Sequence, residues 1–264
     1  ATAFSAVFFI VLRTRVKRRN GSVAIFFRKY LTFCLVVGLI LGIFGSVGIY
    51  TNGAISDSAS MCDPIAILDK AMRSTIPIAT EKGTGTAFAI TATGELVTAA
   101  HVVEGARDIY VNWASGKVSA TILQISSEYD IALLKIMQST PDFLNFSPNY
   151  KPGENVYALG WPSNAFFAGQ ASVSAGIVSR VLSNQDLQLN NTEVTVPSDL
   201  EIVQTDTAIN PGNSGGPLLG KCGVIGVVSA KSDSRQLQEY GIVSEEGISF
   251  AISSETIKSV LKLD

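Results

Sequence analysis

The chain has 264 residues, 47% of them hydrophobic, so it is long enough to bury a sizeable core in one domain or in a pair of barrels. Residues 1–56 contain seven basic and no acidic residues, which leaves 13 of the 20 basic residues against all 22 acidic ones, a net charge of −9 for the remainder. A globular part this acidic argues against nucleic-acid binding, which needs a basic face.

The N-terminal region has the pattern of a membrane anchor. Residues 31–50 are 20 consecutive residues without a charge, and at about 1.5 Å per residue a helix of this length crosses a hydrocarbon core of roughly 30 Å. All seven basic residues precede this run, so the positive-inside rule places residues 1–30 in the cytoplasm and the later residues on the periplasmic or extracellular side. We therefore expect a transmembrane helix over 31–50.

Other interpretations of this region stay open. A buried core helix is one, although such helices rarely run this long without a polar stripe. A cleaved secretory signal is another, although its apolar part usually has about 7–15 residues, and a transit peptide is a third. The apolar residues 1–12 are either the end of an earlier transmembrane helix or a flank with no special role.

The remainder of the chain predicts a linker and one globular domain. Residues 51–63 are small and polar and are typical of a linker. Asp63 and Pro64 then mark a helix start, with the aspartate as N-cap and the proline in the first turn. We assign residues 64–264 to the domain.

Within this domain, short β-rich runs alternate with Gly, Ser, Asn and Asp turn signals. Because few helical patterns interrupt them, they indicate an all-β sandwich or barrel and weigh against a parallel βαβ sheet. The stretch 140–153 is the candidate connection between two β units, one over about 76–140 and one over about 153–252. Residues 254–263 predict a C-terminal helix with Ser254 as its N-cap.

The segment NPGNSGGPL, residues 210–218, suggests a nucleophilic serine, Ser214, set between glycines. A serine hydroxyl is a poor nucleophile unless an adjacent base takes its proton. The spacing also fits the G-x-S-x-G elbow of α/β-hydrolases, but that fold needs a histidine after the serine. The single histidine, His101, precedes Ser214, so the order that survives is His before Ser, as in chymotrypsin-like enzymes, where the histidine comes first, then the aspartate, then the serine.

Asp130 is the candidate carboxylate that would orient this histidine. It directly precedes a predicted strand that begins with the apolar residues 131–134, where an acid can be partly desolvated and still reach an imidazole. Glu128 is the nearest competitor, and we expect it to be more solvated.

The glycines around the serine have a physical role. As negative charge develops on a substrate carbonyl oxygen, backbone N–H groups must point at it. We expect Gly212 and Ser214 to supply these donors. Gly215 and Gly216 would let the chain and the substrate pass closely.

Several motifs resemble, in their order, the HtrA/Deg branch of trypsin-like serine proteases. They cover roughly residues 78–264 and read GTGTAFAI, TAAHVV, YDIALLKI, YALGWP, SAGIVS, QTDTAINPGNSGGPLL and ISFAIS. The resemblance implies two six-stranded antiparallel β-barrels with the active site between them, and endopeptidase activity without a cofactor. It assigns His101 as the base, Asp130 as its orienting acid, Ser214 as the nucleophile and Gly212 as an oxyanion donor. A homotrimer is implied only loosely.

The resemblance also suggests a specificity pocket. In trypsin-like proteases the residue six positions before the serine lies at the base of the pocket for the P1 side chain, and here that residue is Ala208. We expect small or medium aliphatic P1 residues, unless Ala208 merely packs. Ser249, Phe250 and Ala251 are expected to form an edge strand that pairs with the substrate backbone.

The three cysteines have different expected roles. Cys34 falls in the predicted membrane helix, whereas Cys62 and Cys222 would lie on the external side, where disulfides persist. The family architecture would bring the start of the domain near the second barrel, so the resemblance implies a possible disulfide between these two residues. Two unrelated buried thiols are the alternative. A single histidine and dispersed cysteines do not make a metal site.

HtrA proteins usually carry one or two PDZ domains after the protease, and this sequence stops just past the predicted terminal helix. We expect either a membrane-anchored peptidase without a PDZ domain or a piece of a longer chain. The expected function is a serine endopeptidase that cleaves polypeptides on the non-cytoplasmic side. The alternative is a catalytically silent scaffold that holds extended peptides, but binding alone does not require all three of His101, Asp130 and Ser214.

Overall fold

The computed structural model describes residues 62–113, 116–162, 170–190, 195–229, 238–240, 242 and 247–263. These residues belong to one compact unit, Ser60–Asp264. The predicted basic segment, the predicted membrane helix over 31–50 and all but the end of the predicted linker lie outside the described residues. Within the described ranges, no helix is long and apolar enough to cross a membrane.

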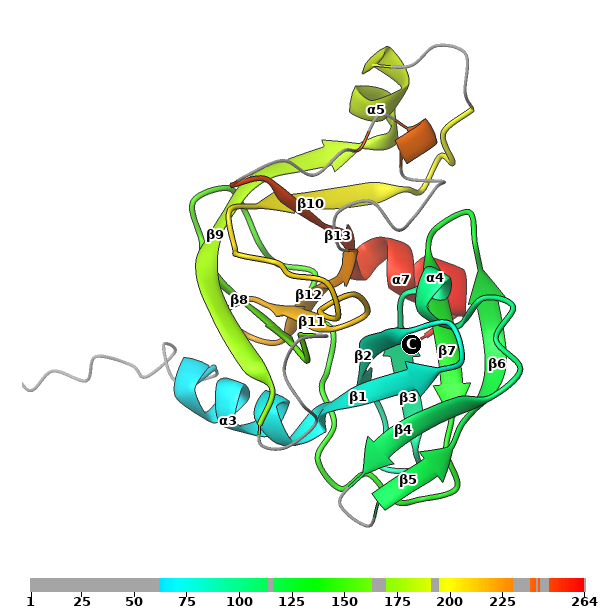
Figure 1. The fold of residues 1–264 in the computed structure, drawn as a ribbon. Coiled ribbons are helices and arrows are strands. Elements are labelled where there is room, and N and C mark those ends of the chain that lie inside the picture. The colour runs from blue at the N-terminus through cyan, green and yellow to red at the C-terminus, as the bar shows by residue number, and fades with distance from the viewer. Residues whose placement is uncertain are drawn as a thin grey trace, which may run out of the picture. The chain divides into compact units, whose positions relative to one another are not determined.

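The first element is helix α3 (Pro64–Ser74), at the position that the sequence predicts. Asp63 is its N-cap, and a carboxylate oxygen of this residue accepts a hydrogen bond of 2.9 Å from the amide of Ile65. Ala71 is fully buried, and Leu68 and other apolar residues of the helix pack beside it against the core. The helix passes directly into the first strand (Figure 1).

The first β unit is an antiparallel sheet with the strand order β5-β4-β1-β2-β3-β7-β6. Its strands are β1 (Thr75–Thr80), β2 (Thr84–Ala89), β3 (Glu95–Thr98), β4 (Ile109–Trp113), β5 (Gly116–Ser119), β6 (Thr121–Ser126) and β7 (Ile131–Lys135). The sheet thus has seven strands where the sequence analysis expects six.

The seventh strand arises because one strand is interrupted at Ala120. The segment before this residue, β5, pairs with β4, and the segment after it, β6, pairs with β7. The amide of Ala120 continues the ladder with a hydrogen bond of 2.9 Å to the carbonyl oxygen of Ile109. Counted as one bent strand, residues 116–126 join the two ends of the sheet and close a ring of six strands.

The second β unit is a closed antiparallel barrel of six strands, as predicted, in the order β10-β13-β12-β11-β8-β9. Its strands are β8 (Asn155–Gly160), β9 (Ser172–Ser183), β10 (Glu201–Thr205), β11 (Pro217–Leu219), β12 (Val224–Ser229) and β13 (Ser249–Ser253). A short helix, α5 (Asn184–Asn190), lies between β9 and β10 in the chain. The all-β double-barrel prediction is therefore confirmed.

The C-terminal helix α7 (Ser254–Leu261) is also confirmed, with one correction. The N-cap is Ser253, not Ser254, because the hydroxyl of Ser253 accepts the amide hydrogen bond of Thr256 while its own backbone is still extended. The helix ends at Lys262, which adopts a left-handed conformation with φ 53°.

Three groups of buried residues hold this unit together. One lies within the first β unit and one within the second. The third includes Phe88 and Val97 of the first unit, Ile202 and Val227 of the second, and Ile257 of α7. Because this third cluster spans both barrels, burial of apolar surface fixes one barrel against the other.

Candidate active site

His101 lies in a one-turn helix, α4 (Ala100–Val103), that follows the end of β3. Its ring nitrogen Nδ1 lies 2.9 Å from each carboxylate oxygen of Asp130, and its backbone amide donates to Oδ1 of the same residue at 3.0 Å. A carboxylate only accepts hydrogen bonds, so Nδ1 is the donor and carries the ring proton. This tautomer leaves the lone pair on Nε2, where a general base needs it.

Asp130 lies in the turn before β7 and is 2% exposed. Its backbone has φ 55°, a left-handed conformation that aspartate tolerates better than most residues. The carbonyl oxygen of Asp130 accepts from the amide of Ala100 at 3.1 Å, so backbone and side chain both bind the start of α4. Glu128, the competing acid of the sequence analysis, is exposed.

Ser214 lies in the turn between β10 and β11 and is 3% exposed. Its carbonyl oxygen accepts from the amide of Thr86 in β2 at 2.9 Å, which joins the serine turn to the first barrel. A Cβ atom at Gly215, where φ is 85°, would lie 2.2 Å from the carbonyl oxygen of Thr86 and 2.8 Å from the amide nitrogen of Ala99. The serine turn thus reaches the residue two before His101, and only glycine fits there.

The turn before the serine has the geometry expected of a tight loop. The amide of Asn213 donates to the carbonyl oxygen of Asn210, and the amide of Gly216 donates to that of Asn213, both at 3.0 Å. Gly212 has φ 97°. Its carbonyl oxygen accepts from the hydroxyl of Thr86 at 2.7 Å. The two residues expected to supply oxyanion donors, Gly212 and Ser214, are therefore both bonded to one residue of the first barrel.

Ser229 is a site residue that the sequence analysis did not single out. It is the last residue of β12, and its buried hydroxyl donates a hydrogen bond of 2.8 Å to Oδ2 of Asp130. The only signal in the sequence is a polar residue at the end of an otherwise apolar strand, which does not identify a partner. The contact depends on how the two barrels meet.

The predicted edge strand over Ser249, Phe250 and Ala251 is wrong. These residues belong to β13, which is hydrogen-bonded to β10 on one side and to β12 on the other, and all three are buried. A strand with two neighbours has no open edge for a substrate backbone. Pairing partners, which the sequence does not show, decide whether a strand is an edge.

Ala208 is exposed, in the connection between β10 and β11. The hydroxyl of Ser249 donates to the carbonyl oxygen of Thr207 at 3.0 Å, so the start of β13 lies beside the residue that precedes Ala208. Ala208, which lies six residues before Ser214 in the chain, is therefore close to Ser249 in the structure.

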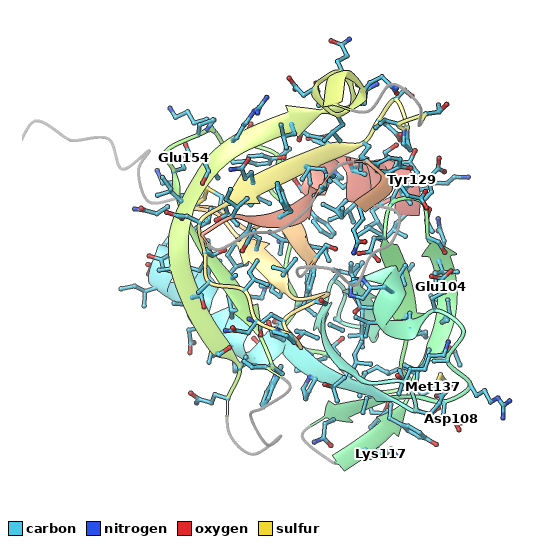
Figure 2. All side chains as sticks on the ribbon, turned by 45° about the horizontal axis from the view of Figure 1, so that its top comes forward. Glu104, Asp108, Lys117, Tyr129, Met137 and Glu154 are labelled. Carbon is cyan, nitrogen blue, oxygen red and sulfur yellow. A yellow bond between two sulfur atoms is a disulfide. The ribbon has the colours of Figure 1, made fainter. Side chains whose placement is uncertain are left out.

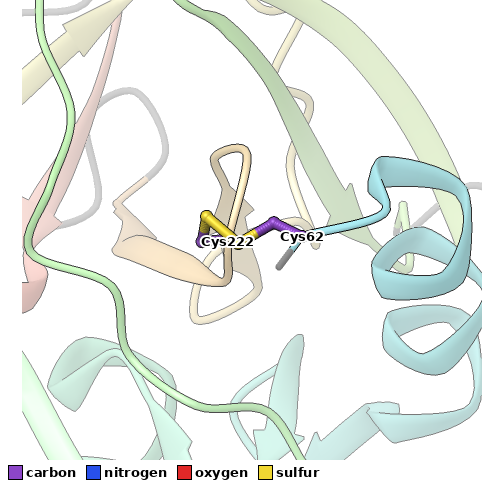
Figure 3. Close-up of a disulfide and its surroundings, with 2 residues drawn as sticks. All are labelled: Cys62 and Cys222. Atoms are coloured by element: carbon purple, nitrogen blue, oxygen red, sulfur yellow. A yellow bond between two sulfur atoms is a disulfide. The ribbon is translucent and has the colours of Figure 1, made fainter. Parts of the chain in front are cut away.

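Cys62 and Cys222 form a disulfide in the structure (Figure 3). Their Cα atoms are 5.0 Å apart. The bond joins the residue just before α3 to the turn between β11 and β12, across 160 residues of sequence. The sequence left a disulfide and two separate thiols as alternatives, and the structure contains the disulfide.

Tyr129, next to Asp130, connects the first barrel to the end of the domain. Its hydroxyl donates to the carboxylate of Asp199, which also accepts from Ser259 of α7 at 2.8 Å, and Figure 2 shows Tyr129 beside α7. The hydrogen bond from Tyr129 lowers the pKa of Asp199 below its usual value. The pKa of Tyr129 is raised, chiefly by burial and next by the hydrogen bond to Asp199.

Among the described residues, no group of three or more His, Cys, Asp or Glu side chains is placed to hold a metal ion. The site thus contains a histidine oriented by a buried acid and a glycine-rich serine turn, and Gly215 of that turn packs against Ala99, two residues before the histidine. Such a set can transfer a proton from a serine hydroxyl and stabilise an oxyanion with backbone amides.

Comparison with known proteins identifies similar chains. A family model described as a trypsin-like peptidase domain matches residues 85–227, which is more than half of the chain. A putative serine protease, HhoB of Synechocystis sp., is 36% identical over 186 residues, 68% of this chain and 40% of that protein. Serine protease HTRA4 of Mus musculus is 38% identical over 184 residues, 67% of this chain and 34% of that protein. The chain thus spans less than half the length of these curated relatives.

Solved structures show the same fold. The HtrA-type protease AlgW, determined with a tripeptide, is 30% identical with a TM-score of 0.59, over 75% of this chain and 61% of that chain. The Rv3671c protease in its inactive form is 22% identical with a TM-score of 0.58, over 76% of this chain and 95% of that chain, and this likeness concerns the fold alone.

Proposed function

We propose that this chain, which belongs to the trypsin-like peptidases and to their HtrA/Deg-like serine proteases, hydrolyses peptide bonds. The residues that would carry out the reaction are His101, Asp130 and Ser214. In this mechanism the hydroxyl of Ser214 attacks the substrate carbonyl carbon while Nε2 of His101 takes its proton. The imidazolium that forms is stabilised by Asp130, and it then protonates the leaving amine. Water repeats the sequence on the acyl-enzyme.

The observation that carries this proposal is the pairing of His101 with a buried carboxylate through Nδ1 at 2.9 Å. That contact selects the tautomer that catalysis requires, and Gly215 of the serine turn packs against Ala99, two residues before His101. The backbone amides of Gly212 and Ser214 would stabilise the developing oxyanion. A scaffold that only holds peptides gains nothing from this arrangement.

The proposed substrates are polypeptides with small or medium aliphatic P1 residues. Support comes from Ala208, which has no charge to pair with a basic P1 side chain and lies near Ser249. The AlgW structure was determined with a tripeptide, which supports peptide binding on this fold.

We further propose that the peptidase domain is tethered to a membrane by residues 31–50 and faces the periplasmic or extracellular side. The uncharged run and the basic residues before it support the tether and its direction. The disulfide between Cys62 and Cys222 supports an oxidising compartment for the domain.

Labelling with a fluorophosphonate probe tests the proposed activity without knowledge of the natural substrate. The whole chain in membranes should be labelled at Ser214, and Ser214→Ala should abolish labelling while the folded structure persists. A well-folded protein that the probe does not label would favour the silent peptide-binding scaffold instead. Protease protection of the domain in intact cells tests the topology separately.

A further inference from the structure

The hydroxyl of Thr86 joins three segments around the serine turn. Thr86 lies in β2 and is completely buried. Its Oγ1 lies 2.7 Å from the carbonyl oxygen of Gly212 and 2.9 Å from the amide nitrogen of Trp161, the residue after β8. Its own amide binds the carbonyl oxygen of Ser214.

The direction of the two hydroxyl bonds follows from the partners. A backbone N–H only donates and a carbonyl oxygen only accepts. The amide of Trp161 therefore donates to Oγ1 of Thr86, and the hydroxyl proton of Thr86 is directed at the carbonyl oxygen of Gly212. The backbone carbonyl of Thr86 is bound as well, by the hydroxyl of Thr98 at 2.7 Å, so the residue is held on all sides.

The bond from Thr86 holds one peptide plane of the serine turn. The carbonyl of the Gly212–Asn213 peptide accepts from Thr86, and the N–H of the same peptide donates to Asn210 at 3.0 Å. The plane is thereby held by both of its polar groups. In the chain this plane lies between the N–H groups of Gly212 and Ser214, so its orientation constrains the directions in which they point.

Gly212 needs such a restraint from outside. At φ 97° it occupies a conformation that glycine enters freely, and no Cβ limits its rotation. Hydrogen bonds must therefore keep the turn in one state, and the bond from Thr86 connects it to a buried strand of the other barrel.

We propose that Thr86 is a positioning residue for the oxyanion site. It acts through the carbonyl of Gly212 and holds the turn so that the amides of Gly212 and Ser214 converge on the substrate oxygen. This inference rests on the proposed peptidase function and adds to it, because it gives the first barrel a part in orienting donors that belong to the second.

The test compares Thr86→Val, which has the same shape without a hydroxyl, with Thr86→Ser, which keeps the hydroxyl. The measurement is the second-order rate of fluorophosphonate labelling of the whole chain, with kcat and KM per titrated active site on a cleavable peptide. Loss of one oxyanion donor costs about 10²–10³ in kcat in a comparable enzyme, so we expect misalignment in Thr86→Val to cost about 10- to 100-fold, mainly in kcat. Thr86→Ser should keep a labelling rate and a kcat within about threefold of those of the parent chain.

Thr140→Val is the matched control. Thr140 is also completely buried, and its hydroxyl accepts from the amide of Gly94 at 3.0 Å and donates to the carbonyl oxygen of Thr91 at 2.5 Å. Like Thr86, Thr140 thus accepts from one backbone amide and donates to one backbone carbonyl. Its two partners precede β3, whereas His101 follows β3, so these bonds lie at the other end of the strand from the site. Thr140→Val should lose thermal stability like Thr86→Val and keep the parent labelling rate.

The pH profile of labelling separates the oxyanion site from the histidine. In Thr86→Val the rate should fall at every pH with an unchanged midpoint, because the pairing of His101 with Asp130 is intact.

A folded Thr86→Val that is labelled at the parent rate would overturn the inference. If Thr86→Val does not fold, Thr86→Cys, with a weaker donor of similar size, should show a loss of about 10-fold, and its equality with Thr86→Ser would overturn the inference. A folded parent chain that is never labelled would instead contradict the proposed function itself.

Discussion

The hydroxyl of Ser229 donates a hydrogen bond of 2.8 Å to Oδ2 of Asp130, and the two residues belong to different barrels. Asp130 is 2% exposed. The ring nitrogen Nδ1 of His101 lies 2.9 Å from both carboxylate oxygens of Asp130, and the backbone amide of His101 donates to Oδ1. The carboxylate therefore receives donors from both barrels. Its position, and with it the orientation of the imidazole, depends on how the barrels pack.

Ser229→Ala should lower the labelling rate about 10-fold, because a hydrogen bond to a charged group contributes about 1.5–3 kcal/mol and part of this holds the acid in place. Ser254→Ala is the matched control, since its buried hydroxyl donates to the carbonyl oxygen of Ser147 at 3.2 Å, away from the acid. Equal rates in the two variants would show that Ser229 does not support the acid.

Asp130→Asn should reduce kcat by a factor on the order of 10⁴, as in the comparable triad. The amide nitrogen of asparagine would face Nδ1 and favour the tautomer whose proton lies on Nε2, which cannot act as a base. Thermal melting should change far less than activity. Glu128→Gln, which changes an exposed acid two residues away, is the control, and a comparable loss in that variant would contradict the assignment.

Removal of the disulfide should destabilise the domain. The bridge closes a segment of 160 residues, for which the chain-entropy relation gives about 5 kcal/mol and typical measured values are about 2–4 kcal/mol. Cys62→Ser combined with Cys222→Ser should therefore lower the melting temperature clearly and make it insensitive to reductant. Cys34→Ser should leave the melting temperature unchanged. An equal decrease in that variant would mean that the removal of any cysteine lowers the melting temperature, and it would contradict the stabilising role of the bridge.

Tyr129→Phe should produce a pH-dependent loss of stability. The pKa of Asp199 is lowered in the folded state, chiefly by the hydrogen bond from Tyr129, so the stabilisation is present above the unfolded value near about 3.9 and is lost as the pH falls through the lower folded value. Since Asp199 is exposed, we expect a difference of only about 2 °C in melting temperature at neutral pH.

This difference between Tyr129→Phe and the parent chain should shrink as the pH is lowered below about 4. Tyr110→Phe keeps its ring under the ammonium group of Lys117, 3.6 Å from the centroid, and should show no such pH dependence. A difference that stays constant into strong acid would exclude the bond to Asp199 as its cause.

The proposed specificity predicts faster cleavage after Val or Ala than after Lys or Arg in a peptide library. Ala208→Asp should shift the ratio toward basic P1 residues by about 10-fold, because the new carboxylate can pair with the incoming cation. Faster cleavage after basic residues by the parent chain would contradict the assignment of Ala208. An unchanged ratio in Ala208→Asp would place this residue outside the pocket.

Part of the fold could be predicted because it depends on local pattern. Short alternating runs identify the strands, and Asp63 before Pro64 identifies the start of α3. The interruption at Ala120 and the interior position of β13 could not be predicted. They depend on which strands become neighbours when a sheet closes, and that is a property of residues far apart in the chain.

Residue types and their order along the chain were enough to propose the chemistry of this protein. A single histidine that precedes a glycine-flanked Ser214 excluded the α/β-hydrolase order and predicted His101 as the base. Only the folded chain shows that Ser229 binds Asp130, that Thr86 binds Gly212, that Cys62 meets Cys222, and that β13 has no free edge. The reason is that residue type and spacing encode reactivity and burial, whereas contacts between barrels exist only once apolar burial has packed them together.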